Sequence, residues 1–380
     1  MDSTKFSRKN RKNRNSKNRK NKKNRKNEKA KKSELIGKGS YGCVFRPSIP
    51  CKKHLSKKKT RKKSRVSKVF VKKHAASALK EFEMNKIIRK IPNYKEWSYT
   101  WKEMCDPPSY KNIKKIAEID ICLKKIDLNK KEYNKGAYML IGEYGGITLT
   151  KYAIKLFPKS AFKSKGNFIK SFMKLFKLIE PILNGVNELN KRKISHMDLS
   201  RGNIMVKDNK CYIIDFGLSC RYNNKISIKE RSLKQVEGSR IYDPYPLDFI
   251  YAFASNENKK KEINAYQSGN FRTNYDDYLL VHKEVFYRKN IEEDIFLNLT
   301  TKSEKEKIIE NLDTYSVGYL VPQLLVELSE YHAIGKKQLL KCFNYTEIQN
   351  HLALFKDMTE YDSVNRIPIA EACERFKHLL

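Results

Sequence analysis

Two polar segments on either side of one short apolar stretch constrain the fold of this chain more than any other feature of its sequence. Residues 196–203 (HMDLSRGN) end in an asparagine, and residues 215–217 (DFG) begin twelve positions after it. Residues 211–214 (CYII) lie between them and are typical of a short buried strand. The sequence therefore predicts a polar loop, a strand and a second polar turn in close succession.

Three glycines near the start of the chain form a second informative pattern. Residues 35–45 (LIGKGSYGCVF) have apolar ends around Gly37, Gly39 and Gly42, which predicts a strand, a glycine turn and a returning strand. Because glycine has no Cβ, such a turn lets backbone N–H groups approach a phosphate. In a dinucleotide-binding unit the third glycine leads into a helix, whereas residues 43–45 continue here as a strand. The pattern alone also fits a plain glycine hairpin.

The order of the expected elements indicates the fold class. Short apolar runs at residues 66–71 and 138–144 predict strands, and residues 75–91 carry apolar side chains at helical spacing before Pro92. Residues 168–190 are predicted to form one long amphipathic helix, and the chain is mainly helical from residue 314 onward. Strands early and helices late predict an α+β protein with a small β-rich lobe and a larger α-helical lobe.

The charge of the chain is strongly basic. A formal net charge of +39 at pH 7 predicts attraction to polyanions such as nucleic acid. Residues 1–33 consist almost entirely of Lys, Arg, Asn and Ser, which predicts a disordered basic tail, and residues 52–65 (KKHLSKKKTRKKSR) predict a solvated basic loop. The tail fits a nuclear-localisation signal, a nucleic-acid tether or a simple solvated tail. Compositional bias of the encoding genome also explains part of the lysine and asparagine excess.

The eight cysteines of the chain are scattered along the sequence. They include no Cys-x-x-Cys pair, and we recognise no Cys/His cluster at zinc spacing. We therefore predict reduced, mostly buried cysteines in an intracellular protein. No apolar run approaches the roughly 18 residues that a membrane-spanning helix needs, so we also predict a soluble protein without membrane contact.

The glycine loop and the two aspartate segments together resemble the eukaryotic-type protein kinase superfamily. Residues 196–203 match its H-x-D-L-x-x-x-N motif and residues 215–217 match its D-F-G motif, in the usual order and at the usual separation. The resemblance implies a bilobal fold with an N-lobe at residues 34–146 and a C-lobe at residues 147–380. The basic loop at 52–65 is then an N-lobe insert, and residues from about 249 to 312 form a C-lobe insert of unknown role.

The resemblance also assigns roles to individual residues. Asp198 is expected to accept or orient the substrate hydroxyl, while Asn203 and Asp215 hold Mg²⁺ and His196 braces the loop. The residues expected to bind ATP are Ile36, Gly37, Lys38, Gly39, Ser40, Tyr41, Gly42, Cys43, Val44, Lys68, Glu83 and Glu143.

Two lysines compete for the role of pairing the ATP phosphates. Lys72 matches the family's V-A-I-K motif more literally, but the residue two positions before the lysine shares its strand face and must be small enough to admit adenine. Val66 meets that requirement for Lys68, whereas Phe70 does not for Lys72, so we favour Lys68. Its helical acidic partner is expected to be Glu83, with Glu81 as the alternative.

Three further segments match the family. Residues 313–318 (DTYSVG) resemble the start of a central helix whose aspartate anchors the catalytic loop. Arg366 resembles an arginine near the last helix, and residues 246–248 (PLD) resemble the A-P-E end of the activation segment.

The catalytic loop departs from the family at two positions. Met197 replaces the arginine that in many members binds an activation-loop phosphate, which argues against phosphate-dependent activation. Ser200 stands where the family has a lysine, and the neighbouring Arg201 is expected to supply that cation on the γ-phosphate. The missing lysine weakens the serine/threonine assignment and leaves tyrosine specificity open.

These patterns predict an ATP- and Mg²⁺-dependent serine/threonine kinase acting on protein substrates, with polyanion contact through the tail. The alternatives are a polyanion-binding pseudokinase and a small-molecule phosphotransferase with a kinase-like fold. The bias toward Lys and Asn and the degenerate motifs resemble kinases of large DNA viruses, for which the host cytoplasm or nucleus would be the compartment.

Overall fold

The computed structural model describes residues 32–39, 42–54, 64–237, 242, 244–255, 257–258, 281, 285–286, 302–360 and 362–380. The tail up to residue 31, most of the basic insert and most of the insert at 249–312 lie outside these residues. The chain forms two compact units, which are described separately. The first comprises the chain up to Ala78 and Lys102–Tyr144, and the second comprises Leu79–Trp101 and Gly145–Leu380. The sequence did not predict that residues 79–101 belong with the second unit.

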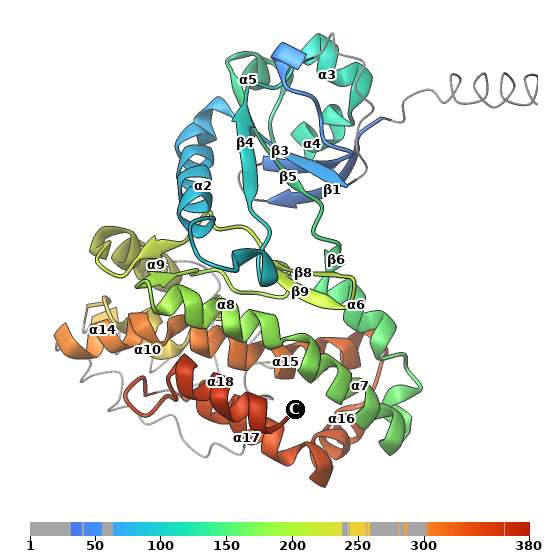
Figure 1. Cartoon of the computed structure of the whole chain (residues 1–380), viewed down its shortest axis with the longest axis vertical. Helices are drawn as coiled ribbons and strands as arrows, with labels where there is room; N and C mark the ends of the chain where they lie inside the picture. Colours follow the sequence, from blue (N-terminus) through green and yellow to red (C-terminus); the bar gives the residue numbers. More distant parts are fainter. Residues whose placement is uncertain are drawn as a thin grey trace, which may run out of the picture. The chain divides into compact units, whose positions relative to one another are not determined.

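The first unit is built on a five-stranded sheet with the order β1-β2-β3-β5-β4 (Figure 1). The predicted glycine hairpin joins β1 to β2, and β2, β3 and β5 pair antiparallel in succession. The strands are β1 Glu34–Gly39, β2 Gly42–Arg46, β3 Arg65–Val71, β4 Trp101–Cys105 and β5 Ala137–Glu143.

The register of the sheet decides which side chains share a face. Lys68 pairs with Val44 on one side and Leu140 on the other, so these three lie in one row on one face. Val69 belongs to the opposite face, where sheet residues pack against three helices that were not predicted from the sequence. These helices, which lie between β4 and β5 in the chain, are α3 Tyr110–Ile116, α4 Ile119–Lys125 and α5 Lys130–Asn134.

The cysteines of the first unit correct one expectation. The structure joins Cys43 to Cys122 and Cys51 to Cys105 in disulfides, whereas the sequence predicted reduced cysteines throughout. Segments 54 or more positions apart supply each pair, so spacing along the chain gave no signal. The remaining four cysteines are free and buried, as expected: Cys211, Cys220, Cys342 and Cys373.

The second unit is mainly helical. Its small sheets are formed by β6 Ile147–Thr148, β8 Ile204–Lys207 and β9 Lys210–Ile213, and by β7 Ile194–Ser195 with β10 Cys220–Arg221. Its helices are α6 Leu149–Leu156, α7 Lys165–Leu178, α8 Glu180–Asn190, α9 Lys225–Glu237, α10 Leu247–Tyr251, α14 Lys302–Glu310, α15 Leu312–Tyr331, α16 Lys336–Phe343, α17 Gln349–Met358 and α18 Ile369–His378. Helix α2 Ala75–Ile88 begins in the first unit and continues in the second. Short 3₁₀ turns are η1 Lys52–His54, η2 Lys72–His74, η3 Tyr94–Glu96, η4 Ala161–Lys163 and η6 Thr346–Ile348.

One expected helix is two. The segment predicted as a single helix over 168–190 divides into α7 and α8, with Ile179 between them. Pro181 lies in the first turn of α8, where its missing N–H has no helical partner in any case. A proline that favours a helix start therefore marks a boundary here rather than a kink.

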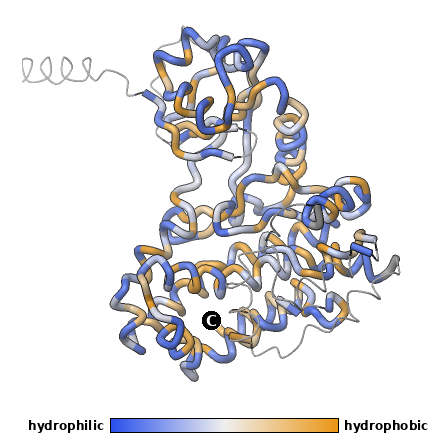
Figure 2. The backbone as a smooth tube through the Cα atoms, turned by 180° about the vertical axis from the view of Figure 1, so that it is seen from behind, coloured by the Kyte–Doolittle hydropathy of each residue, from blue (hydrophilic) through white to orange (hydrophobic). Residues whose placement is uncertain are grey.

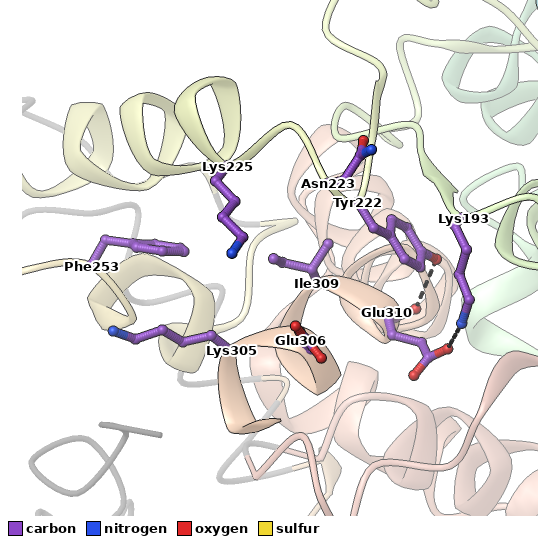
Figure 3. A pocket seen from close by; sticks show the side chains of 9 residues that line it. All are labelled: Lys193, Tyr222, Asn223, Lys225, Phe253, Lys305, Glu306, Ile309 and Glu310. Atoms are coloured by element: carbon purple, nitrogen blue, oxygen red, sulfur yellow. Dashed lines mark hydrogen bonds and ion pairs between the residues drawn. The ribbon is translucent and has the colours of Figure 1, made fainter. Parts of the chain in front are cut away.

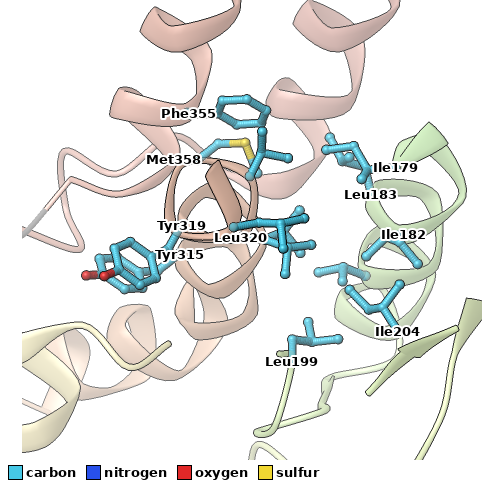
Figure 4. Packing of buried hydrophobic residues seen from close by; sticks show 14 of the residues in the cluster. Ile179, Ile182, Leu183, Leu199, Ile204, Tyr315, Tyr319, Leu320, Phe355 and Met358 are labelled. Atoms are coloured by element: carbon cyan, nitrogen blue, oxygen red, sulfur yellow. The ribbon is translucent and has the colours of Figure 1, made fainter. Parts of the chain in front are cut away.

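The core of the second unit surrounds α15. Hydrophilic and hydrophobic residues alternate along most helices (Figure 2), but α15 is buried on nearly all sides. Side chains from α8, α15 and α17 pack together, and Leu199 and Ile204 reach the same cluster (Figure 4). Hydrophobic packing thus holds the polar loop at the residue after Asp198 and again where the loop enters β8.

The architecture confirms the expected α+β class, with a β-sheet N-terminal region and a helical C-terminal part. Among the described residues, no helix combines the length and the apolar character that crossing a membrane would require.

Candidate active site

The backbone of the polar loop is anchored to the first turn of α15. Asp313 accepts hydrogen bonds from the N–H of His196 at 2.6 Å and from that of Met197 at 3.1 Å. Burial raises the pKa of Asp313 to about 6, although both N–H donors favour its charged form. Met197 itself has a φ of 60°, so the loop makes a sharp turn at this anchor.

His196 connects the loop to the strand before Asp215. Its Nδ1 accepts from the Asp198 N–H at 3.2 Å, so Nε2 carries the proton and donates to the Ile214 carbonyl at 3.1 Å. Burial lowers the pKa of His196 to about 4, which keeps the ring neutral. The ring packs edge-on against Phe216 with centroids 5.0 Å apart. His196 is therefore placed to brace the loop rather than to act as a base.

Asp198 is held by the side chain of Asn203. The Asn203 Nδ2 donates to the Asp198 carbonyl at 2.8 Å and to its Oδ2 at 2.7 Å. Burial raises the pKa of Asp198, and the charge of Asp215 adds to this effect, while Tyr242, Arg231 and Asn203 oppose it. The result is a positioned carboxylate that is more basic than an ordinary aspartate.

Asp215 lies in the turn directly after β9. It has a left-handed φ of 63°, and the Ile214 N–H donates to the Asn203 carbonyl at 2.9 Å, which ties the two polar segments together. Carboxylate and amide oxygens are ligands that Mg²⁺ prefers. The donor types of Asn203 and Asp215 therefore suit the metal that the sequence predicted.

Helix α2 corrects the choice of its acidic residue. Glu83, which the sequence favoured, is 52% exposed and forms an ion pair with Lys86 at 2.7 Å. Glu81 is only 2% exposed and accepts a hydrogen bond from the Trp101 indole. A Cβ added to Gly217 would lie 3.4 Å from Glu81 Oε2 and 3.2 Å from Asp215 Oδ1, so both carboxylates border this glycine. The structure thus favours Glu81, the alternative.

The two candidate lysines of the first unit differ in burial. Lys68 is 4% exposed within β3, and its Nζ lies 5.1 Å from the centre of the Phe70 ring. Lys72 lies beyond the strand in η2 and is exposed. A buried lysine needs an anionic partner or ligand, which supports Lys68.

The three glycines of the hairpin differ in whether the packing of the strands requires a residue without a Cβ. A Cβ on Gly42 would lie 2.3 Å from the Val69 carbonyl oxygen, so the close approach of β2 to β3 requires glycine there. At Gly37 and Gly39 the atoms nearest to an added Cβ would lie 3.8 and 3.9 Å away, so strand packing does not require glycine at either position. Ser40 and Tyr41, also expected to bind ATP, lie outside the described residues.

The remaining nucleotide-site candidates of the first unit lie in β1, β2 and β5. Ile36 is exposed, Lys38 continues β1, and Val44 shares the face of Lys68. The side chain of Cys43 is fully buried in the opposite face and bonded to Cys122, so only its backbone remains for a ligand. The ATP contact expected of Cys43 therefore stays a prediction for its backbone.

Two expected site residues have ion-pair partners in the structure. Arg201 pairs with Glu327 of α15, so its guanidinium has a competitor for the phosphate role proposed for it. Glu143, at the end of β5, pairs with Lys102 at the surface.

Three residues that were not among the expected site residues lie beside the loop. Arg231 of α9 donates from Nε to the Tyr245 hydroxyl at 2.7 Å, and Tyr245 donates to the Met197 carbonyl. The Tyr242 hydroxyl lies near Asp198, although its geometry falls short of a full hydrogen bond. Arg231 thus brings a guanidinium close to the loop in which Met197 replaces the family's arginine. Its position in the chain gave no signal of this role.

A separate pocket of about 500 Å³ lies between α14 and the segment around β10 (Figure 3). Lys193 forms an ion pair with Glu310 at its edge, and the Tyr222 hydroxyl donates to the Glu310 carbonyl. None of the predicted catalytic or metal-binding residues lines this pocket. We therefore do not assign the active site to it.

Comparisons with known proteins agree with this arrangement. A family model for the protein kinase domain matches residues 30–246, more than half of the chain. A curated relative from Dictyostelium discoideum, named probable serine/threonine-protein kinase irlD, is 43% identical over 53 residues. That match covers 14% of this chain and only 4% of the relative.

Proposed function

Because the chain belongs to the protein kinase family, we propose that it transfers the γ-phosphate of ATP to serine or threonine hydroxyls of protein substrates. The observation that carries this proposal is the geometry around Asp198. Asn203 holds its carboxylate, His196 holds its backbone, and Asp313 anchors the loop from a buried helix. Such rigidity is what positioning catalysis requires.

Asp198 is the proposed acceptor of the substrate proton. Its raised pKa gives the carboxylate greater basicity than an exposed aspartate has, which favours taking a proton from a hydroxyl. Asn203 fixes the direction in which the second carboxylate oxygen points. The neutral ring of His196 leaves Asp198 as the base of the loop.

The nucleotide and metal requirements also fit the residues present. Asn203 and Asp215 would hold Mg²⁺, and the glycine hairpin with Lys68 would hold the phosphates of ATP. When bound, Mg-ATP supplies the phosphoryl group and the cation that neutralises its charge. In place of Glu83, Glu81 is the proposed acidic residue of α2, because its carboxylate is buried beside the 215–217 turn.

Serine/threonine specificity rests on weaker support than kinase activity does. The name of the Dictyostelium relative points to it, but the matching segment is short. The test below therefore distinguishes phosphorylation of tyrosine from phosphorylation of serine or threonine.

The test measures transfer of labelled γ-phosphate from Mg-ATP to mixed acidic and basic proteins. Asp198→Asn and Asp215→Asn should each abolish transfer, and phosphoamino-acid analysis should find phosphoserine or phosphothreonine. Asp357→Asn is the matched control, because Asp357 is half-exposed and forms a surface ion pair with Arg375. Phosphotyrosine alone would overturn the specificity, and a folded wild type without transfer under all metals and substrates would overturn the activity.

A further inference from the structure

Four side chains of metal-binding types lie close together in the first unit, and none of them belongs to a kinase motif. Cys51, His54 and Glu103 each offer a ligand atom, and these atoms all lie within 4.8 Å of one another. Cys105 is joined to Cys51, so its sulfur borders the same group. In the part of the chain that the structure describes, this is the one such group of three or more residues.

Two short segments present these side chains. Cys51 and His54 are separated by one 3₁₀ turn, in which the His54 N–H donates to the Cys51 carbonyl at 2.8 Å. Glu103 and Cys105 are two positions apart in β4, so they point to the same side of the strand. The Lys52 N–H donates to the Asp106 carbonyl at 2.8 Å, which fixes the turn against the end of β4. This hydrogen bond and the Cys51–Cys105 disulfide hold the two segments together in the structure.

The contact between Cys51 and Glu103 fits a reduced site better than a disulfide. The Cys51 Sγ lies 3.3 Å from Glu103 Oε1. A disulfide sulfur carries no proton, so this approach to a carboxylate has no donor in the oxidised pair, whereas a thiol would donate and a bound cation would attract both atoms. Oxidised and metal-bound forms are mutually exclusive at this position.

We propose that, in the reduced protein, Cys51, His54, Glu103 and Cys105 bind one Zn²⁺ that joins the β2–β3 connection to β4. Two thiolates, one imidazole and one carboxylate form a four-ligand set of the kind zinc takes, with ligand atoms about 3.3–3.8 Å apart around a tetrahedral ion. The ligand atoms of Cys51, His54 and Glu103 already lie within 4.8 Å of one another, and the Cys105 sulfur becomes the fourth ligand once its bond to Cys51 is broken. The site does not depend on the proposed kinase activity.

The charges around the group are consistent with the proposal. Two thiolates, one carboxylate and Zn²⁺ leave one negative charge on the site. The Arg65 guanidinium lies 3.8 Å from Glu103 Oε2, and Lys52 and Lys53 lie within the turn itself. Nearby cations favour thiolates over thiols, which promotes metal binding.

This site also revises the interpretation of the sequence. The run CKKH at residues 51–54 has a Cys-x-x-His spacing, but it opens the basic insert and was not recognised as part of a metal cluster. Its partners Glu103 and Cys105 lie about 50 positions further along the chain, so only the fold brings the four together.

Metal binding first requires reduction of the Cys51–Cys105 bond. A water-soluble phosphine breaks the S–S bond and becomes a phosphine oxide with the oxygen of water, whose two protons complete the two thiols. Zinc then displaces both protons into solvent. The phosphine is preferable to a dithiol because a dithiol would itself compete for zinc.

The experiment titrates the reduced full-length protein with Zn²⁺ and, as a spectroscopic probe, with Co²⁺. The wild type should bind one equivalent, with the sulfur-to-cobalt charge-transfer band and the strong visible bands of tetrahedral Co²⁺. Three variants each remove one proposed ligand: Cys51→Ser, Cys105→Ser and His54→Ala. Loss of a group that only hydrogen-bonds to a metal ligand weakens metal binding by roughly 10–100-fold, so each of these variants should weaken zinc binding by more than that. Cys43→Ser with Cys122→Ser is the matched control and should retain full binding, since that buried pair has no part in the cluster.

A second measurement on the unaltered chain guards against variants that fail to fold. After reduction, zinc should protect Cys51 and Cys105 from alkylation, as read by mass spectrometry, and leave the labelling of the other six cysteines unchanged. Two results would overturn the proposal. In one, the wild type binds no more metal than Cys51→Ser does; in the other, zinc does not selectively protect Cys51 and Cys105.

Discussion

Asp248 and Arg366 form a fully buried ion pair in the second unit. They are 118 positions apart, both side chains are 0% exposed, and Arg366 Nη2 donates to Asp248 Oδ2 at 2.8 Å. Burial raises the pKa of Asp248 to about 6 despite the neighbouring guanidinium. Arg366 also donates to the Glu360 carbonyl at 2.7 Å. The pair therefore connects the first turn of α10 to the chain just before α18.

Breaking this pair from one side is expected to be strongly destabilising. Arg366→Met leaves a buried carboxylate without its partner and should lower the free energy of unfolding by about 3–5 kcal/mol. Asp248→Asn should act similarly, and the double variant should lose less than the sum of the two. Urea unfolding checks this, with Lys377→Ala as the control, because the surface pair of Lys377 with Glu374 should contribute nothing measurable. Additive losses would show that the two residues do not act as a pair.

His196 gives the second unit a defined response to acid. Its folded pKa of about 4 lies below the usual value of 6.5, so on acidification the unfolded chain takes up a proton first. The associated stability is present above pH 6.5 and is lost as the pH falls toward 4, by up to about 3 kcal/mol.

The raised pKa values of Asp313 and Asp248 increase the stability of the fold as the pH falls over a similar range, which opposes the effect of His196. The effect of His196 must therefore be measured as the difference between wild type and a His196 variant. His196→Asn should be less stable than wild type at pH 7 but should lose less stability between pH 7 and pH 5. Trp97 is buried in the core of the second unit, so the change in its fluorescence in urea reports the unfolding of that unit. The exposed His378→Asn is the control, and equal pH slopes for wild type and His196→Asn would contradict the assignment.

The choice between Glu81 and Glu83 can be tested by activity. If Glu81 is the functional acid of α2, Glu81→Gln should lower kcat by about 100-fold, the order expected when reacting groups lose their alignment. Glu83→Gln should leave kcat unchanged, because that side chain contacts solvent and Lys86. Phosphotransfer assays on both variants decide between the residues, and a selective loss in Glu83→Gln would restore the original expectation.

At the level of elements, the packing of α15 against α17 depends on one glycine. A Cβ added to Gly318 would lie 2.5 Å from the Met358 Cβ and 3.2 Å from the Phe355 carbonyl oxygen. The close approach of these helices therefore requires glycine at the end of the 313–318 segment. Asp313 anchors the catalytic loop from the same helix, so a displacement of α15 would be transmitted to Asp198.

Gly318→Ala is expected to destabilise the protein by about 1–3 kcal/mol through overpacking. The matched control is Gly166→Ala in α7, where an added Cβ meets nothing within 4 Å. Because alanine restricts the unfolded chain and favours helix, that variant should be more stable by about 0.5–1 kcal/mol. Thermal unfolding of both variants measures the contrast, and equal shifts in Tm would rule out the packing argument.

At the level of the whole molecule, charge is unevenly distributed along the chain. Residues 1–33 hold 16 of the 81 Lys and Arg residues but only 2 of the 42 acidic ones. A polyanion that binds this tail releases counterions, so its affinity falls steeply with salt.

Deletion of residues 1–31, which spares the buried and hydrogen-bonded Ser33, should therefore weaken binding to single-stranded nucleic acid. It should also reduce the slope of log K against log salt by about 0.7 for each phosphate that the tail neutralises in the intact chain. Phosphotransfer to a neutral peptide should be unaffected by the deletion. Fluorescence anisotropy at several salt concentrations checks the slope. An unchanged slope would assign polyanion binding to the folded units instead.

Local motifs were sufficient to predict the class of fold and the protein kinase family. Residues 196–203 and 215–217 act through residue types at short spacing, so they can be recognised without knowing which segments touch. The contact predicted for Asp313 was confirmed, because its carboxylate accepts from the backbone of the loop, whereas the partner of Arg366, Asp248, was not predicted. The order of strands and helices determined the α+β class for the same reason.

Only the tertiary structure decided which side of each element is buried and which distant segments meet. Glu81 and Glu83 differ by about 200° around the helix, and the packing of α2 buries one and exposes the other. Arg231 reaches the loop, and Cys51 meets Glu103, through contacts that no spacing along the chain encodes. The periodicity of a sequence indicates which side chains share one face of a helix or strand. Only the folded chain determines which other element packs against that face.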